Sequence, residues 1–145
     1  MDTTRNRTWD LTVEREVAAS PEDCFDAFVA LYDTDRPEWV TESDLDLRVG
    51  GRWHVRFHPA PNPPFREERT VTDVHRGKEL GYHARIQDDE GHERFATQVL
   101  VTFEPTASGT SIRLTQTGFE DEAARDEFEA NWPGVLTEVA RRLGD

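Results

Sequence analysis

Five histidines are the first candidates for chemistry, and their spacing argues against a metal centre. His54 and His58 are four residues apart, like a zinc pair on a helix, but their segment alternates like a β-strand. Four strand residues span about 13 Å, too far for two ligands that each bind zinc at about 2 Å. We therefore expect no bound metal and no cofactor. If a bulge at Gly50-Gly51 or Gly81 shifts the register, His54 or His83 faces the interior as an acid or base; otherwise all five histidines lie at the surface.

The other reactive residue types form no catalytic pattern. With 30 acids in 145 residues, neighbouring carboxylates arise by chance. Such neighbours occur at 67–68, 88–90 and 121–122. Glu67 and Arg69, or Arg66 and Glu68, are same-face neighbours if their segment is a strand. Cys24, the only cysteine, falls on the apolar face of a predicted helix, which is typical of a core residue. The sequence has no nucleophile elbow, phosphate loop or dinucleotide-binding motif. We expect no catalytic residue.

Aromatic residues form a larger constellation. Strand and helix periodicity allows seven of them to face one interior: Trp53, Phe57, Tyr82, Phe95, Phe103, Phe128 and Trp132. In a solid core such side chains interdigitate and leave no void. In a binding protein they line an apolar pocket with a few polar groups. The polar candidates for that pocket are Tyr82, Thr97, Gln116 and Arg85, together with His83 or His54 if a bulge turns either inward. The sequence leaves both alternatives open.

Composition narrows the class of partner. Seventeen Lys and Arg against 30 Asp and Glu give a formal net charge of −13. Because phosphate binding needs a basic surface, we expect neither nucleic acid nor a membrane as partner. No apolar stretch approaches the roughly 18 residues of a membrane span. The N-terminus has no apolar signal-peptide core, and we expect a cytoplasmic protein.

The elements that must position these residues follow from periodicity. Segment 8–18 alternates as a strand with Leu11, Val13 and, after a shift, Val17 on one face. Ser20 and Pro21 then suit the N-cap and first position of a helix. From residue 42 to 118 the period is two, which predicts about six antiparallel strands.

Within this region, Leu45, Leu47 and Val49 alternate with polar residues, and Gly50-Gly51 marks a turn or bulge. Trp53, Val55 and Phe57 face one way, and the intervening Arg and His residues face the other. Four prolines within residues 59–64 predict a stiff loop between two strands.

The last segment returns to helical period. Residues 121–143 carry apolar side chains three and four residues apart. Pro133 is expected to kink or restart this helix near Asn131. A long terminal helix with a wide apolar stripe must lie across one face of the sheet, an α+β arrangement. We expect a single domain over residues 1–145, with its core at 8–143.

This order resembles the START-like (SRPBCC) superfamily. The residues that carry the resemblance are Val49-Gly50-Gly51-Arg52-Trp53, Gly109-Thr110-Ser111-Ile112-Arg113-Leu114-Thr115, and Trp132 followed by Val135, Leu136 and Val139. Within the superfamily the chain is most similar to the family named for the activator of the ninety-kilodalton heat-shock chaperone's ATPase. The resemblance implies a helix-grip fold of the START or Bet v type, a curved antiparallel sheet wrapped around the C-terminal helix, with a cavity between them. Where the family usually has Gly-Trp, this chain has Asn131-Trp132-Pro133.

We expect non-catalytic binding of a small hydrophobic or aromatic molecule in that cavity. The ligand-binding residues are predicted to be Trp53, Phe57, Tyr82, Phe95, Phe128 and Trp132, with polar groups from His83, His54, Thr97 and Gln116. The resemblance implies an alternative, a chaperone-ATPase activator or stress-response interaction protein. A second alternative is an enzyme of the cyclase or hydrolase type that uses a pocket histidine. A homodimer is compatible with this fold.

Overall fold

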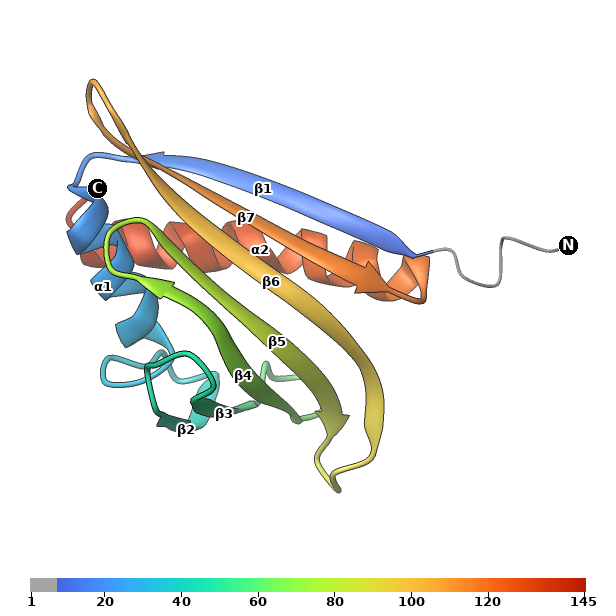
Figure 1. The fold of residues 1–145 in the computed structure, drawn as a ribbon. Helices are drawn as coiled ribbons and strands as arrows, with labels where there is room; N and C mark the ends of the chain where they lie inside the picture. The colour runs from blue at the N-terminus through green and yellow to red at the C-terminus, as the bar shows by residue number, and fades with distance from the viewer. Residues whose placement is uncertain (1–7) are drawn as a thin grey trace, which may run out of the picture.

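A curved antiparallel sheet and two helices make up the computed structural model, which describes residues 8–145 (Figure 1). The strands are β1 (Trp9–Val17), β2 (Val40–Leu45), β3 (Arg52–Phe57), β4 (Phe65–His75), β5 (Glu79–Asp88), β6 (Glu93–Thr106) and β7 (Gly109–Phe119), and the helices are α1 (Pro21–Leu31) and α2 (Glu122–Arg142). The seven strands form one sheet in the order β1-β7-β6-β5-β4-β3-β2. The expected α+β helix-grip arrangement is confirmed.

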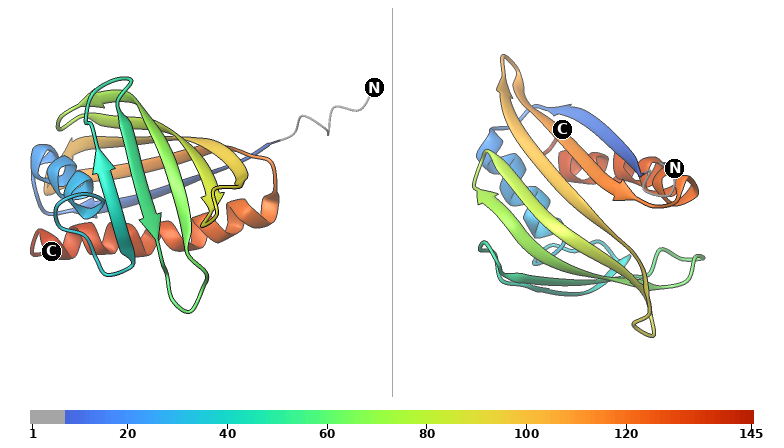
Figure 2. Two further views of the ribbon diagram at one scale, coloured as in Figure 1. Left: turned by 90° about the horizontal axis from the view of Figure 1, so that it is seen from below. Right: turned by 45° about the vertical axis from the view of Figure 1, so that its right-hand side comes forward.

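Both helices lie inside the curve of the sheet, as the two views in Figure 2 show. The side chains that α2 buries there are Phe128, Trp132, Leu136, Val139 and Ala140. The core therefore lies between the concave face of the sheet and the two helices.

Between Thr8 and Asp145, neither helix is long and apolar enough to cross a membrane.

Helix α1 begins where the sequence predicts. The Ser20 side chain accepts a hydrogen bond from the backbone N–H of Asp23 at 3.1 Å, and Pro21 occupies the first helical position. This cap satisfies one of the backbone donors that every helix leaves free at its N-terminus. Phe25 and Phe28 are buried on the face of α1 that meets the sheet. The cap and these apolar contacts together fix α1 over the sheet.

Strand β1 keeps one register where the sequence predicts a shift. Leu11, Val13, Arg15 and Val17 share a face, and the only irregularity in the pairing with β7 lies between Trp9 and Leu11. Between Val13 and Val17 this face carries a charged residue, Arg15, whose guanidinium donates to the Thr137 hydroxyl at 3.3 Å. The long aliphatic part of an arginine lets it take an inward position beneath a helix.

The turn before β3 is tighter than the sequence indicates. The prediction of an alternating strand through Leu47 and Val49 is wrong, since β2 ends at Leu45 and these two side chains are 39% and 63% exposed. Gly51 comes close to the chain just before it, because a Cβ there would lie 2.0 Å from the carbonyl oxygen of Asp46. The turn thus replaces the end of the predicted strand.

Helix α2 does not restart at Pro133. The helix continues from Glu122 to Arg142 with Pro133 inside it. Proline provides no N–H for the carbonyl of Glu129, but both residues are exposed, so water reaches the carbonyl that is left free. The proline therefore faces solvent while Trp132 beside it faces the core.

We predict opposite effects of alanine at two glycines. Gly51→Ala should lower the free energy of unfolding by about 2 kcal/mol or more, because its Cβ would overlap backbone oxygen. Gly134→Ala lies in helix α2 with open space around it, and should raise the free energy of unfolding by about 0.5–1 kcal/mol. Urea denaturation of both variants tests this, and equal effects would contradict the described turn.

Candidate functional site

The interior contains a cluster of aromatic rings on the side of β3 and β5. Trp53 and Tyr82 meet edge to face with ring centres 5.1 Å apart. Tyr32, at the C-terminal end of α1, lies 6.0 Å from the ring of Trp53 and 6.0 Å from that of Phe57. These distances are those of favourable aromatic pairs. We call these four residues the Trp53 cluster.

A second aromatic group lies nearer the start of α2. Phe128 is 5.8 Å from Phe95 and 5.6 Å from Phe119, measured between ring centres. Phe28 of α1 lies 5.6 Å from Tyr32 and stacks on Trp132 at 6.5 Å. Ring contacts therefore extend from the Trp53 cluster to the middle of α2, and Phe95, Phe119 and Phe128 form a second group of rings that contact one another.

All six predicted ligand-binding residues belong to this interior. Trp53 and Tyr82 have no exposed surface, Phe57 and Trp132 are each 6% exposed, and Phe128 is 8% exposed. Phe95 is partly buried and packs against the core. The structure thus brings the predicted residues together on the concave side.

The polar centre of the Trp53 cluster is Arg69 of strand β4. Its guanidinium carbon lies 4.4 Å from the ring centre of Tyr82 and 4.5 Å from that of Trp53. The rings of Tyr32 and Phe57 are 4.7 and 5.8 Å away. Aromatic rings attract a cation through the negative potential of their faces. Four rings therefore surround a guanidinium that is 2% exposed.

Glu67 provides the charge that balances this cation. The Arg69 Nε–H donates to Glu67 Oε1 at 2.8 Å, and Glu67 is 6% exposed. Burial by itself lowers the pKa of Arg69, but the nearby Tyr82, Glu67 and Tyr32 oxygens raise it above its ordinary value. Burial also raises the pKa of Tyr82, although Arg69 opposes this. The site at neutral pH is therefore an ion pair beside a neutral phenol.

Three polar atoms of Arg69 and the Trp53 cluster have no hydrogen-bond partner. They are Arg69 Nη1, Trp53 Nε1 and the hydroxyl oxygen of Tyr82. Buried polar groups are hydrogen-bonded in the great majority of cases, since an unpaired one costs about 1–3 kcal/mol. Within residues 8–145 only two other buried side-chain atoms lack a partner, one on Arg15 and one on Thr106. Unused donors are thus concentrated at one place in the interior.

A second polar group lies across the sheet from Arg69. The Trp132 indole N–H donates to Gln116 Oε1 at 2.8 Å, and Gln116 Nε2 donates to the Thr97 hydroxyl at 2.9 Å. Thr97 and Gln116, both predicted as polar groups of the interior, are 3% and 2% exposed. This series of two hydrogen bonds connects α2 to strands β6 and β7.

The strand registers place a small residue between the two polar groups. Trp53 is paired with Arg69, Arg69 with Ala84, and Ala84 with Thr97, so these four form one row across β3, β4, β5 and β6. All four are buried on the same face. Ala84 therefore lies between the Arg69 guanidinium site and the Thr97–Gln116–Trp132 chain.

The two histidines predicted for the polar pocket lie on the opposite face of the sheet. His54 is half-buried there, where its Nδ1 contacts Glu68 and its Nε2 lies 3.4 Å from Glu42. His83 is exposed on β5 between Tyr82 and Ala84, which face inward. The strand β3 pairs with β4 without a register shift, so Gly50-Gly51 does not turn His54 inward. The remaining histidines, His58, His75 and His92, are exposed.

Three residues in the β5–β6 turn have side-chain atoms of the kind that bind metal ions. One carboxylate oxygen from each of Asp88 and Glu90 and one ring nitrogen of His92 lie within 4.8 Å of one another. Asp88 already accepts hydrogen bonds from the backbone N–H groups of Glu90 and His92, at 3.0 and 2.9 Å. The hydrogen bond from the His92 backbone is the main reason that the pKa of Asp88 is lowered. These contacts make it a hydrogen-bonded turn.

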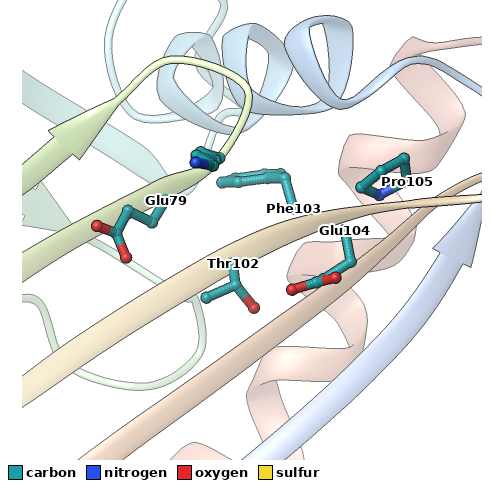
Figure 3. Close-up of a pocket in the computed structure, with 6 residues that line it drawn as sticks. Glu79, Thr102, Phe103, Glu104 and Pro105 are labelled. Carbon is teal, nitrogen blue, oxygen red and sulfur yellow. The ribbon is translucent and has the colours of Figure 1, made fainter.

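A surface hollow of about 310 Å³ opens at the start of β5 and the end of β6 (Figure 3). Its lining is mostly polar: Lys78, Glu79, Thr102, Phe103, Glu104 and Pro105. Figure 3 shows the Phe103 ring pointing toward α1, where it lies 5.5 Å from Phe25. Of the seven aromatic residues predicted to face the interior only Phe103 lines this hollow, and none of the six predicted ligand-binding residues does.

Sequence reasoning recognised Glu67 and Arg69 as neighbours but did not place them inside. A pattern of charges on both faces of β4 hides which face is buried. The available signal was parity, because Phe65 and Val71 share a face with Glu67 and Arg69. A bulge between Val71 and Asp73 obscures it, because it brings Val74, an even-numbered residue, onto the inward face beside Leu80.

A curved sheet that grips a C-terminal helix over a partly polar interior defines a START-like helix-grip protein. The chain belongs to the family described as Activator of Hsp90 ATPase homolog 1-like protein, whose model matches residues 18–144. No curated protein matches the chain.

Solved structures with the same fold come from several bacteria. The AHSA1 protein of Silicibacter pomeroyi has 24% identity and a TM-score of 0.78, over 94% of this chain and 98% of that one. A Mycobacterium smegmatis protein has 18% identity and a TM-score of 0.77, over 92% and 90%. A Mesorhizobium loti protein has 23% identity and a TM-score of 0.72, over 94% and 97%. At such identities the likeness establishes the fold.

The buried ion pair makes a specific prediction for stability. Glu67→Gln keeps the shape of the side chain but removes the charge that balances Arg69. The free energy of unfolding should fall by about 3 kcal/mol, since an uncompensated charge is left in the interior. As a matched control, Glu93→Gln breaks an exposed pair with Arg85 and should cost less than about 1 kcal/mol.

Removing both charges separates the ion pair from packing. Arg69→Met combined with Glu67→Leu should be more stable than Glu67→Gln alone, because apolar residues of similar volume need no countercharge. Guanidinium denaturation at neutral pH measures all three variants. Equal losses for Glu67→Gln and Glu93→Gln would contradict a buried, charged Arg69.

Proposed function

We propose that this protein binds a small hydrophobic or aromatic molecule between the sheet and α2, without transforming it. The observation that carries the proposal is an interior lined by aromatic rings, with unpaired polar atoms beside the Trp53 cluster. Core packing alone does not require buried polar groups without partners, whereas binding sites combine apolar walls with a few oriented polar groups. The walls of the proposed site are Trp53, Phe57, Tyr82, Phe95, Phe128 and Trp132, with Thr97 and Gln116 as polar groups.

Entry to this site requires side chains to move. Trp53 and Tyr82 have no exposed surface, whereas Phe128 and Trp132 of α2 are 8% and 6% exposed. We therefore place the entrance where Phe128 meets the partly buried Phe95, whose ring centre lies 5.8 Å away, because these two wall residues are nearest to solvent. The closed interior is then the ligand-free state, and binding changes the environment of Trp132.

The small residue in the centre of the row offers a test. Ala84→Leu should weaken binding of the neutral fluorescent probe N-phenyl-1-naphthylamine about tenfold, since added methyl groups occupy the space beside Thr97 and Arg69. Ala130→Leu, on the exposed face of α2, adds the same atoms outside the site and should leave binding unchanged.

Probe emission titrations on folded protein measure both affinities, with circular dichroism as the check of folding. Saturable binding to the natural protein that is lost in Ala84→Leu supports the site. No saturable binding to the natural protein, or equal binding to both variants, contradicts it.

The family match favours a second candidate, interaction with a chaperone. The matched family is described by activation of the Hsp90 ATPase, and the match covers residues 18–144. In this reading the chain acts through its outer surface, in the cytoplasm. The ATPase rate of an Hsp90-type chaperone with and without this protein decides the question. A rise supports the candidate, and an unchanged rate at saturating protein contradicts it.

A further inference from the structure

We infer that the ligand is a flat, electrically neutral molecule that carries an oxygen acceptor, such as a ring ketone, bound by Arg69 and Tyr82. This inference rests on the proposed function and specifies the chemistry of its ligand. Three observations carry it: the hydrogen-bonding direction of the unpaired atoms, the charge balance of the cluster, and the flat rings that surround it.

The unpaired atoms of the cluster call for an acceptor. Arginine and tryptophan nitrogens can only donate hydrogen bonds, and a neutral tyrosine hydroxyl can donate. The atoms without partners are Arg69 Nη1, Trp53 Nε1 and the Tyr82 hydroxyl. The carboxylate oxygen that Arg69 does contact belongs to Glu67 and is bound through Nε. A carbonyl oxygen, which accepts two hydrogen bonds, is complementary to this surplus of donors.

The charge of the cluster favours a neutral ligand. The Arg69 cation is already balanced by the Glu67 carboxylate at 2.8 Å. A ligand carboxylate would bring one excess negative charge into an interior where Arg69 and Glu67 are 2% and 6% exposed. Burying a charge without a counterion is costly. A neutral carbonyl uses the donors without this cost.

The surrounding rings favour a flat body. Trp53 and Tyr82 meet edge to face at 5.1 Å, and Phe28 and Trp132 stack with 18° between their planes. Ala84, the smallest side chain of the row, is the strand partner of Arg69. A planar ring system offers both faces and edges to such neighbours. Its oxygen would point toward β4 and its rings toward α2.

Three ligands with one ring body test the inference: fluorene, 9-fluorenone and fluorene-9-carboxylate. Displacement of N-phenyl-1-naphthylamine gives their affinities for the full chain. We expect 9-fluorenone to bind about fivefold or more tightly than fluorene, which is the effect of one net hydrogen bond. We expect the carboxylate to bind more weakly than the ketone.

Tyr82→Phe isolates the hydroxyl. Because this hydroxyl has no partner in the free protein, its removal should leave the unfolding midpoint unchanged or slightly raised. The preference for 9-fluorenone over fluorene should fall at least threefold. Arg69→Met with Glu67→Leu, which removes both charges, should reduce the same preference while fluorene still binds.

The outcomes separate the inference from the proposed function. If fluorene and 9-fluorenone bind equally well, or if Tyr82→Phe leaves the preference intact, the inference is overturned while the binding function stands. Equal binding is also the result expected if an ordered water is the partner of these donors. Tighter binding of the carboxylate overturns the choice of a neutral ligand. If none of the three ligands displaces the bound probe, the inference fails, whereas the proposed function fails only if the probe itself shows no saturable binding.

Discussion

A buried cation determines how the interior of this protein is arranged. Taking a guanidinium out of water costs several kcal/mol, and this cost must be offset within the core. Here the offset comes from the Glu67 carboxylate at 2.8 Å and from four aromatic rings within 5.8 Å of the guanidinium carbon. Those rings come from α1, β3 and β5, so the cation ties the first helix to three strands. The compact packing of the Trp53 cluster is a consequence of this requirement.

Because of the same cation, the two ends of the interior differ in their hydrogen bonding. One end has donors without partners around Arg69, and the other has a completed hydrogen-bond chain from Trp132 to Thr97. Ala84 lies between them, in the row that crosses β3 to β6. An all-apolar core would be equally stable or more so, and it would offer no polar atoms to orient a bound molecule. The polar asymmetry is what connects this fold to recognition of a ligand.

Periodicity predicted most of the fold, because each face of each strand is set by alternation. It placed Trp53, Phe57 and Tyr82 inward, and Thr97 and Gln116 with them. It did not predict that Arg69 and Glu67 are buried, since charged residues in a strand are normally assigned to the solvent face. Parity with Phe65 and Val71 was the one signal in the sequence, and the pairing of Arg69 with Trp53 and Ala84 establishes that it faces inward. The end of β2 was also missed, because the backbone contact that requires Gly51 depends on the turn itself.

The central claim is that Arg69 is a charged side chain enclosed in the core. Hydrogen exchange of its Nε–H, followed by side-chain NMR of ¹⁵N-arginine-labelled protein, tests this most directly. Arg48, whose side chain is 73% exposed and also donates through Nε to a carboxylate, provides the internal comparison. The account predicts that the Arg69 Nε–H signal persists at neutral pH and exchanges at least a hundredfold more slowly than that of Arg48. Exchange of both at the same rate would contradict it.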